Sequence, residues 1–485
     1  MTMQKITLAV AALLSACSMA PPLEMPQVPV APQYKEIGPW AAAQPADQLP
    51  RGAWWTLYRD PGLDVLEQQL IANNPDLAAA LANYAQAEAY ASQLRSGLFP
   101  NVSANASADR NRDSLNRPLR GANTSNHYSD YVIGVQADYE VDLWGRVRNL
   151  VTSGKASAEA EQANLESTRL SLQAELAQQY ITLRGLDREI ALLQDTVAAY
   201  RKTLDLTIAR HDGGLAPGLD VARARTQFES AQSQVAQAQA RRALAEHAIG
   251  ALVGALVSEF SIAPSTEAIA QPTVPVGMPS ELLQRRPDIA AAQRRIIAAN
   301  ADIGVAKSAY FPRLNLSGVL GYESAALGDL IAAPSLFWAV GPALALDLFD
   351  GGRRKAQVAQ TQAALDQMGA QYRGVVIRAF QQVEDNLALL NHYGNALQSQ
   401  RAATNAAKQS QDFATVRYEQ GAASYLEVTA SQTVYLDSQR ELLDLDTRTL
   451  QASVQLIRAL GGGWNDKAAE NSSTKSAADL SPDPS

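Results

Sequence analysis

Few side chains in this sequence have the types and spacing that chemistry requires. The first is Cys17, the only cysteine in 485 residues, which ends the segment "LLSAC". Before it, a positive charge at Lys5 and a short apolar run from Ile6 to Leu14 form the pattern of an export signal. A cysteine in this place matches the bacterial lipobox, whose thiol is acylated after cleavage. We therefore predict a signal peptide over residues 1–16 and N-acyl and diacylglycerol lipid on Cys17; the alternative is an unmodified thiol.

The other residues that serve as catalysts or metal ligands form no recognisable site. The four histidines lie far apart in the sequence and lack metal-ligand spacing: His127, His211, His247 and His392. A phosphate-binding loop and a nucleophile elbow are both missing from the sequence. The net charge of -8, without a basic stripe, argues against a nucleic-acid partner. The sequence therefore predicts no enzyme activity, no metal and no cofactor beyond the lipid.

The strongest pattern in the sequence is an internal duplication, in which the same series of short motifs occurs twice in the same order. The pairs Pro75-Asp76 and Phe99-Pro100 recur 212 residues later as Pro287-Asp288 and Phe311-Pro312. Further along, "YEVDLWGR" recurs as "LALDLFDGGRR", and "ARHDGGLAPGLDV" recurs as "VRYEQGAASYLEV". Because the order is the same both times, we predict two tandem structural repeats, each with a helix, two strands, a long helix and a further helix.

The repeats and the composition of the ends predict the domain boundaries. We expect a Pro-rich, lipid-anchored leader and equatorial segment over 17–58, repeat 1 over 59–260, an inter-repeat equatorial segment over 261–278, repeat 2 over 279–465 and a disordered tail over 466–485.

Each repeat is predicted to contain one very long helix. Apolar residues recur every three or four positions, the heptad pattern of a coiled coil. In repeat 1 they are Leu183, Leu186, Ile190, Leu193, Val197, Tyr200 and Leu204; in repeat 2 they are Val358, Leu365, Met368, Tyr372, Val375, Ala379, Val383, Leu387 and Leu390. A helix from Arg146 to His211 would be about 100 Å long at 1.5 Å per residue. Such a helix needs neighbours along its whole length.

The predicted strands alternate between apolar and polar residues. The segment "YVIGVQADYEVDLWG" (131–145) places Tyr131, Ile133 and Val135 on one face and Gly134, Gln136 and Asp138 on the other. The segments at 311–324 and 335–349 alternate in the same way. Strands of a membrane barrel have this pattern, although a soluble sheet with one wet face would share it.

Four strands in one chain cannot close a barrel, and lipid does not tolerate open strand edges. Several chains must therefore contribute to one wall, and the composition alone permits a dimer or a trimer.

This layout resembles the TolC-like outer-membrane factors, in particular the lipid-anchored efflux branch typified by OprM and NodT. The resemblance covers about residues 45–465. It is carried by the doubled "PD" and "FP" pairs, by "VDLWGR" and "LDLFDGGRR", by "RYEQGAASYLEV" and by the final "ALGGGWN" (459–465).

The family resemblance implies a mixed, mainly α fold that is completed in a homotrimer. Four strands per chain would form an outer-membrane β-barrel that continues into a long periplasmic α-helical barrel. It also implies a passive efflux duct in the outer-membrane lipid that works with a periplasmic adaptor protein and an inner-membrane pump of the resistance-nodulation-division type. The pairs Phe99-Pro100 and Phe311-Pro312 would mark where helix hands over to strand, since proline ends a helix.

The resemblance also implies a gate at the periplasmic tip. Gly214 and Gly421 would form the turns between helices. Leu426 would form an apolar constriction and Glu427 an acidic ring, with Leu219 and Asp220 as their counterparts in repeat 1. The alternative for both acids is an ordinary place at a helix start, where the macrodipole stabilises negative charge.

Two departures from the family pattern affect this gate. Ala430 stands where an aspartate is usual, and no basic latch residue lies near Ala423 or Thr433. The nearest charged candidates are Arg417, Arg223 and Arg225, so we expect a closed state that is latched differently.

The sequence leaves two other functions open. One is the outer-membrane duct of a type I protein secretion system. The other is a periplasmic coiled-coil lipoprotein without a pore, which would leave the alternating strands unexplained.

Overall fold

The computed structural model describes residues 18–29, 31–36, 53–116, 118, 125–272, 274 and 285–462. The predicted signal peptide, Cys17 and the predicted tail at 466–485 lie outside the described residues, and the leader and the inter-repeat segment lie partly within them. The chain divides into two compact units. The first contains residues 1–27, 83–162 and 291–372, and the second contains residues 28–82, 163–290 and 373–485.

The predicted repeat appears directly in the order and length of the elements. Helix α3 (Pro75–Ser96) and helix α7 (Pro287–Ser308) both have 22 residues. Helix α4 (Arg146–Asp212) and helix α8 (Arg353–Glu419) both have 67, and α5 (Gly218–Leu252) and α9 (Tyr425–Ala459) both have 35. Two strands stand between α3 and α4, and two between α7 and α8. Within the described residues, no helix has a stretch long and apolar enough to cross a membrane.

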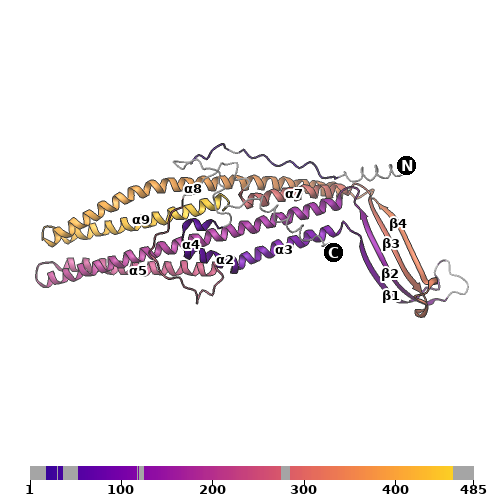
Figure 1. Ribbon diagram of the computed structural model, residues 1–485, viewed down its shortest axis with the longest axis horizontal. Coiled ribbons are helices and arrows are strands. Elements are labelled where there is room, and N and C mark those ends of the chain that lie inside the picture. The colour runs from indigo at the N-terminus through magenta and orange to yellow at the C-terminus, as the bar shows by residue number, and fades with distance from the viewer. Residues whose placement is uncertain are drawn as a thin grey trace, which may run out of the picture. The chain divides into compact units, whose positions relative to one another are not determined.

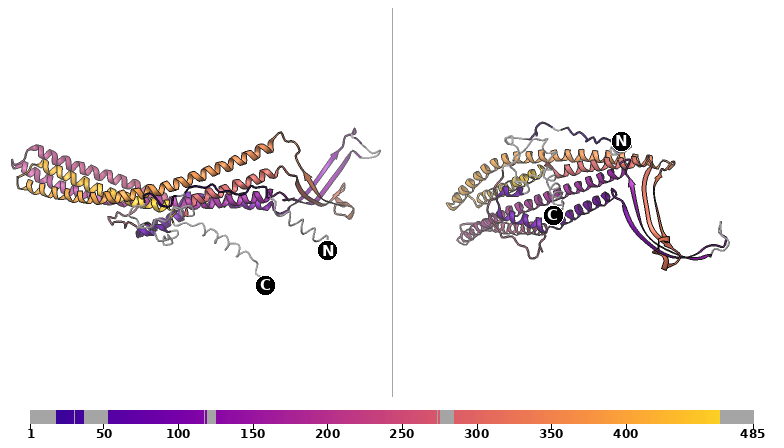
Figure 2. Two further views of the ribbon diagram at one scale, coloured as in Figure 1. Left: turned by 90° about the horizontal axis from the view of Figure 1, so that it is seen from above. Right: turned by 45° about the vertical axis from the view of Figure 1, so that its right-hand side comes forward.

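The four strands form one antiparallel sheet in the first unit. They are β1 (Asn101–Arg112), β2 (His127–Val141), β3 (Arg313–Ser324) and β4 (Leu336–Ala345). Figure 1 shows them side by side in the order β1-β2-β3-β4, and Figure 2 shows that the strands curve along their length. The two hairpins, one from each repeat, therefore join through β2 and β3.

The register of the sheet separates an apolar face from a polar face. Tyr139 lies opposite Leu316, and Val135 lies opposite Leu320, which in turn faces Trp338. Asp138 pairs with Asn101 on one side and Ser317 on the other. Residues opposite each other across strands share a face, so the alternation of β2 continues into its neighbours at these positions, although the polar face also contains Val319, Phe337 and Ala339.

The strands end earlier than the alternation predicted. We expected strands through 145 and 349, but β2 ends at Val141 and β4 at Ala345. The carboxylate of Asp142 accepts bonds from the N–H groups of Val147 and Arg148 at 3.2 and 2.9 Å. It therefore caps the first turn of α4 and removes the chain from the sheet. Asp350 accepts from the N–H groups of Gly352 and Arg354 in the corresponding place.

Most of the predicted heptad positions lie in a buried seam of the long helices, whereas Ile190, Val197, Val358, Leu365 and Met368 are only half-buried. In α4, Leu183, Leu186, Leu193, Tyr200 and Leu204 are buried. In α8, Ala379, Val383, Leu387 and Leu390 are buried, and Val376 takes the buried place that we predicted for Val375.

A short helical segment packs on the long helices in the second unit. The 3₁₀ helix η2 (Trp54–Tyr58) precedes α2 (Pro61–Asn73). Asp60 caps α2 by accepting from the N–H groups of Gly62 and Leu63, and it also accepts from the Tyr180 hydroxyl of α4 at 2.8 Å. The Tyr58 hydroxyl lies 2.7 Å from that of Ser453 on α9.

Charged side chains of α4 and α5 hold the described part of the inter-repeat segment against these two helices. The Asp187 carboxylate accepts from Arg242 at 2.6 Å, from Arg184 at 3.0 Å and from the Ser265 N–H at 3.1 Å. Glu246 accepts from the Ile262 N–H at 2.6 Å. Because these charged groups bond the backbone, the segment lies against α4 and α5 without secondary structure of its own.

Glu67 of α2 is fully buried, and among the residues that the structure describes neither of its carboxylate oxygens has a hydrogen-bond partner. Burial, with a smaller contribution from Asp64, raises its pKa well above the ordinary 4.5. Above about pH 4.5 the folded chain therefore binds more protons than the unfolded chain, so stability falls as the pH rises through this window. The Glu67→Leu variant should be more stable by about 2 kcal/mol at neutral pH, because an unpartnered buried group is removed.

This gain is measured as the apparent unfolding temperature in detergent at pH 5 and pH 8. It should be larger at pH 8. A gain of equal size at both pH values would show that ionisation of Glu67 is not its cause. Glu259→Gln, at an exposed glutamate, is the control and should change little.

Candidate functional site

The two turns between long helices have the same local structure. Gly214 and Gly421 both have a φ of 75°, the left-handed region that favours glycine. The N–H of Leu215 donates to the Arg210 carbonyl at 2.7 Å, and the N–H of Ala422 donates to the Arg417 carbonyl at 2.8 Å. Each glycine therefore ends one helix and lets the chain reverse into the next.

The four predicted gate residues lie in the first turns that follow. Leu219 is 58% exposed and Leu426 is 53% exposed, so each chain presents two apolar side chains to its surroundings. Asp220 lies 3.8 Å from Arg223, and Glu427 lies 3.3 Å from Arg417. Both acids are also in first turns, where the macrodipole favours them. The helix-start role and a gate role are therefore compatible.

Arg210, which we did not predict, links the end of α4 to the end of α8. Its guanidinium donates to the carbonyls of Tyr418 and Glu419 at 3.2 and 3.0 Å. It also lies over the Tyr418 ring, 4.6 Å from the centroid. A positive charge on the last carbonyls of a helix is favourable, so this contact ties one hairpin tip to the other.

A second link joins the starts of α5 and α9. The Tyr425 hydroxyl donates to the Gln227 side-chain oxygen at 3.2 Å, and the Gln227 amide donates to the Thr429 carbonyl at 3.3 Å. Like Arg210, Gln227 was missed, because its partners lie about two hundred residues away in the sequence. For Arg210 the repeat offered a signal, since "ARHDGG" matches "VRYEQG" around Arg417.

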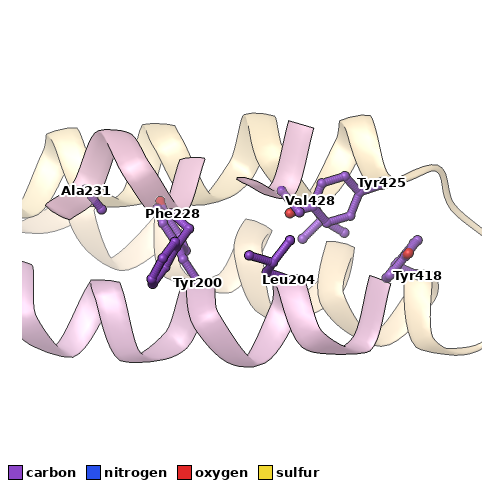
Figure 3. Packing of buried hydrophobic residues seen from close by; sticks show 8 residues of the cluster. Tyr200, Leu204, Phe228, Ala231, Tyr418, Tyr425 and Val428 are labelled. Atoms are coloured by element: carbon purple, nitrogen blue, oxygen red, sulfur yellow. The ribbon is translucent and has the colours of Figure 1, made fainter. Parts of the chain in front are cut away.

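Aromatic residues fill the space between these links. Figure 3 shows Tyr200 and Leu204 of α4, Phe228 and Ala231 of α5, Tyr418 of α8, and Tyr425 and Val428 of α9 gathered in one cluster. Burial and the nearby Asp437 raise the pKa of Tyr200 to about 12, and burial also raises that of Tyr425. Both phenols are therefore neutral at physiological pH, and the cluster is a small apolar core directly behind the tip.

The predicted handover residues all lie in the first unit, directly before β1 and β3. Phe99 and Phe311 each donate an N–H to the carbonyl of the serine three residues earlier, at 3.0 Å, and the proline that follows each of them directly precedes the strand. The Trp144 ring stacks on Phe311 with centroids 4.6 Å apart, and its Nε1 donates to the Pro312 carbonyl at 2.8 Å. The start of β3 is thus fixed to the loop that follows β2. Phe99, the counterpart of Phe311, is 62% exposed.

The leader begins next to the strand ends of the same unit. The Ser18 hydroxyl donates to Asn149 in the first turn of α4 at 3.0 Å, and Asn300 of α7 donates to the Pro21 carbonyl at 3.0 Å. A Cβ on Gly304 would lie 2.8 Å from the Ala20 nitrogen. The glycine is therefore needed for this close approach. Cys17 precedes this segment and lies outside the described residues.

Comparison with known proteins identifies the family. The family described as "Outer membrane efflux protein" matches residues 66–255 and 278–462. The chain belongs to the outer membrane efflux protein family.

Relatives within this outer membrane efflux protein family span nearly the whole chain. The toluene efflux pump outer membrane protein TtgC of Pseudomonas putida is 33% identical over 97% of this chain and 98% of its own length. Outer membrane protein OprJ of Pseudomonas aeruginosa is 32% identical over 95% of each.

Two solved structures of outer-membrane channels have the same fold as this chain. The outer-membrane channel OprN superposes with a TM-score of 0.85 at 29% identity, over 92% of this chain and 99% of that one. For the fold alone, the CmeC channel of Campylobacter jejuni gives a TM-score of 0.87 at 23% identity, over 95% and 98%.

The predicted resemblance, the mainly helical fold with four strands per chain, and the outer-membrane location are thereby confirmed. The chain is an outer-membrane channel component of an efflux system. Among the residues that the structure describes, no group of three or more His, Cys, Asp or Glu could hold a metal ion.

Loss of the Arg210 link should loosen the tip of this efflux protein. In Arg210→Met the carbonyls of Tyr418 and Glu419 lose a charged donor, which is worth about 1 kcal/mol at a partly exposed site. We expect the variant to show more frequent or longer open events in planar-bilayer recordings than the wild type. The control, Arg448→Met, breaks an exposed pair with Asp444 and should leave the gating unchanged. If the two variants behave alike, the Arg210 link has no part in closure.

Proposed function

We propose that the chain forms a homotrimeric, passive exit duct of a tripartite efflux system. Support comes from its sheet, whose strands β1 and β4 each have a neighbour on one side only within the described residues. Four strands cannot close a barrel, and open edges are unstable in lipid. Three copies would supply twelve strands. The apolar face with Leu320 and Trp338 would then contact lipid, and the polar face with Asp138 would line the pore.

The long helices support the same assembly. Apolar residues are exposed on their surfaces, among them Ile377, Phe413 and Val434. Neighbouring copies would cover such side chains in a helical barrel through the periplasm. The partners would be a periplasmic adaptor protein and an inner-membrane pump of the resistance-nodulation-division type, which would supply the energy. This role requires no catalysis by the chain itself.

The tip would be the gate of this duct. In a trimer, Leu426 and Glu427 would each be present three times around the axis, with Leu219 and Asp220 between them. Because Ala430 takes the usual place of an aspartate, the acids at 427 and 220 would carry the negative charge. The Arg210 link and the pair Arg417–Glu427 are among the contacts that hold the tip in each copy, and they would have to rearrange on opening.

We also propose that Cys17 carries the N-acyl and diacylglycerol lipid that its lipobox implies. The seating of Ser18 on Asn149 supports this proposal, because it fixes the chain beside the strand ends. The cargo class is proposed from relatives whose names refer to toluene, antibiotic and solvent efflux. Small apolar or amphipathic toxic compounds are therefore the expected substrates.

The test is efflux in a deletion strain that is complemented with the wild-type gene or with Cys17→Ser. Loss of the gene should raise dye accumulation and sensitivity to toluene and antibiotics several-fold, and the wild-type gene should reverse both. Cys17→Ser should complement less well if the lipid positions the trimer.

Unchanged accumulation together with a loss of protein secretion would favour the alternative, the duct of a type I secretion system. A purified protein without conductance in planar bilayers would contradict both duct proposals.

A further inference from the structure

The charged residues of the four strands divide between the two faces of the sheet by the sign of their charge. Within β1 to β4, all of whose residues the structure describes, every acidic residue shares the polar face: Asp109, Asp130, Asp138, Glu140 and Glu323. The apolar face has no acidic residue in these strands. Its only basic residues there are Arg110, Arg112 and His127, which lie together at one end of the β1–β2 hairpin.

The register assigns Arg110 and Arg112 to the apolar face. Ala108 pairs with Tyr131, which belongs to the apolar row of β2. Because every second residue of a strand points to the same face, the row that contains Ala108 continues through Arg110 to Arg112. The ladder is unbroken over these positions, since Arg110 pairs with Ser129 and Arg112 with His127.

The two arginines begin where the apolar row ends. On β2 this row extends from Val141 to Tyr131, which is ten residues, or about 33 Å along the strand. At a strand tilt of about 40° it covers about 25 Å of height, which is the height of the apolar band on a membrane barrel. Ser129 is the next residue of that row, so its partner Arg110 lies one step beyond the band.

Tyrosines mark the same boundary. Tyr131 is the last apolar residue of the row on β2, and Tyr322 of β3 pairs with Ile133, one step before it. Tyrosine is enriched where the hydrocarbon of a membrane meets the headgroups. The arginines next to this boundary therefore lie at the level of the lipid headgroups.

The position of the arginines in the hairpin decides which leaflet they meet. Strand β1 follows α3, and β2 leads into α4 (Figure 1). Arg112 at the end of β1 and His127 at the start of β2 are therefore at the end of the hairpin that is farther from these helices. This inference rests on the proposed duct, in which the helices extend into the periplasm and this end of the sheet reaches the outer leaflet.

Both guanidinium groups are available to a ligand. Arg110 and Arg112 are exposed, and among the residues that the structure describes neither has an ion-pair or hydrogen-bond partner. Two residues apart on one strand, their Cα atoms are separated by about 7 Å, so both can reach one phosphorylated headgroup. Guanidinium is suited to this role because its planar fork binds phosphate through two parallel hydrogen bonds.

We propose that Arg110 and Arg112 bind the phosphate groups of the lipid in the outer leaflet. The His127 ring lies on the same face opposite Arg112 and adds a polar contact. A lipid fits this surface better than a free phosphate ion, because the apolar row directly below the arginines would contact its acyl chains. The acidic residues, on the opposite face of the sheet, do not repel it.

Binding of lipid A, a glycolipid with two phosphate groups, tests this proposal. The purified full-length protein is titrated with lipid A, and the lipid retained on it is counted by native mass spectrometry. Arg110→Gln with Arg112→Gln should weaken binding at least about tenfold, because each arginine near a membrane surface contributes about fivefold. Lipid A without its phosphates should bind the wild type as weakly.

A matched control removes two exposed arginines elsewhere in the chain. Arg313→Gln with Arg401→Gln takes one arginine from the polar face of β3 and one from α8, and it should bind lipid A like the wild type. Equal binding by the wild type and the Arg110/Arg112 double variant would overturn the proposal. Equal binding of lipid A with and without phosphates would also overturn it, and so would displacement of lipid A by inorganic phosphate at equal concentration.

Conductance of the same samples separates this proposal from the proposed duct. The Arg110/Arg112 double variant should conduct in planar bilayers like the wild type, because both side chains lie on the face away from the pore. A conducting protein without phosphate-dependent lipid binding overturns the lipid site and leaves the duct intact. A wild type that does not conduct contradicts the duct, and with it the outer-leaflet position on which the lipid site rests.

Discussion

The backbone at the two sides of the four-stranded sheet, which has no partner among the described residues, is the constraint on which the rest of this molecule depends. A sheet with an apolar outer face is stable in lipid only if each edge finds a partner. The chain supplies half of every such junction and therefore needs copies of itself. The long helices also need neighbouring copies, since helices of 67 residues expose more surface than one chain can cover.

Duplication allows one kind of contact to be used twice. The stacking of Trp144 on Phe311 and the β2–β3 pairing join the two repeats inside a chain. At the other end, Arg210 and Gln227 join the two hairpin tips. In both places, a residue of repeat 1 contacts a residue of repeat 2. In a ring of identical copies, repeat 2 of one chain would lie beside repeat 1 of the next and could make equivalent contacts.

Periodicity made most of the fold accessible from the sequence. The heptads identified the seams of α4 and α8, the alternation identified the faces of β2, β3 and β4, and the glycines located both tip turns. The strand ends were wrong, because Asp142 and Asp350 cap helices in a stretch where the alternation continues. Arg210 was missed because its partners are backbone carbonyls about two hundred residues away, and the only signal in the sequence was its match with Arg417 in the repeat.

Glu67 was missed for a different reason. It lies between Leu63, Leu66 and Leu70 at the three- and four-residue spacing of a buried helix face, so its burial could have been read from the pattern. Its charge obscured that pattern, because glutamate is rarely buried without a partner. The roles of Leu219, Asp220, Leu426 and Glu427 depend on neighbouring copies, and therefore no single chain can define them.

The carboxylate of Asp60 has a consequence for how the second unit comes apart. One oxygen accepts the first N–H groups of α2 and also the hydroxyl of Tyr180. Separation of α2 from α4 therefore removes a partner from the same atom that holds the start of α2 in helical form. Detachment and fraying of this segment are coupled, so it opens as one cooperative unit, and amide hydrogens along α2 should exchange together.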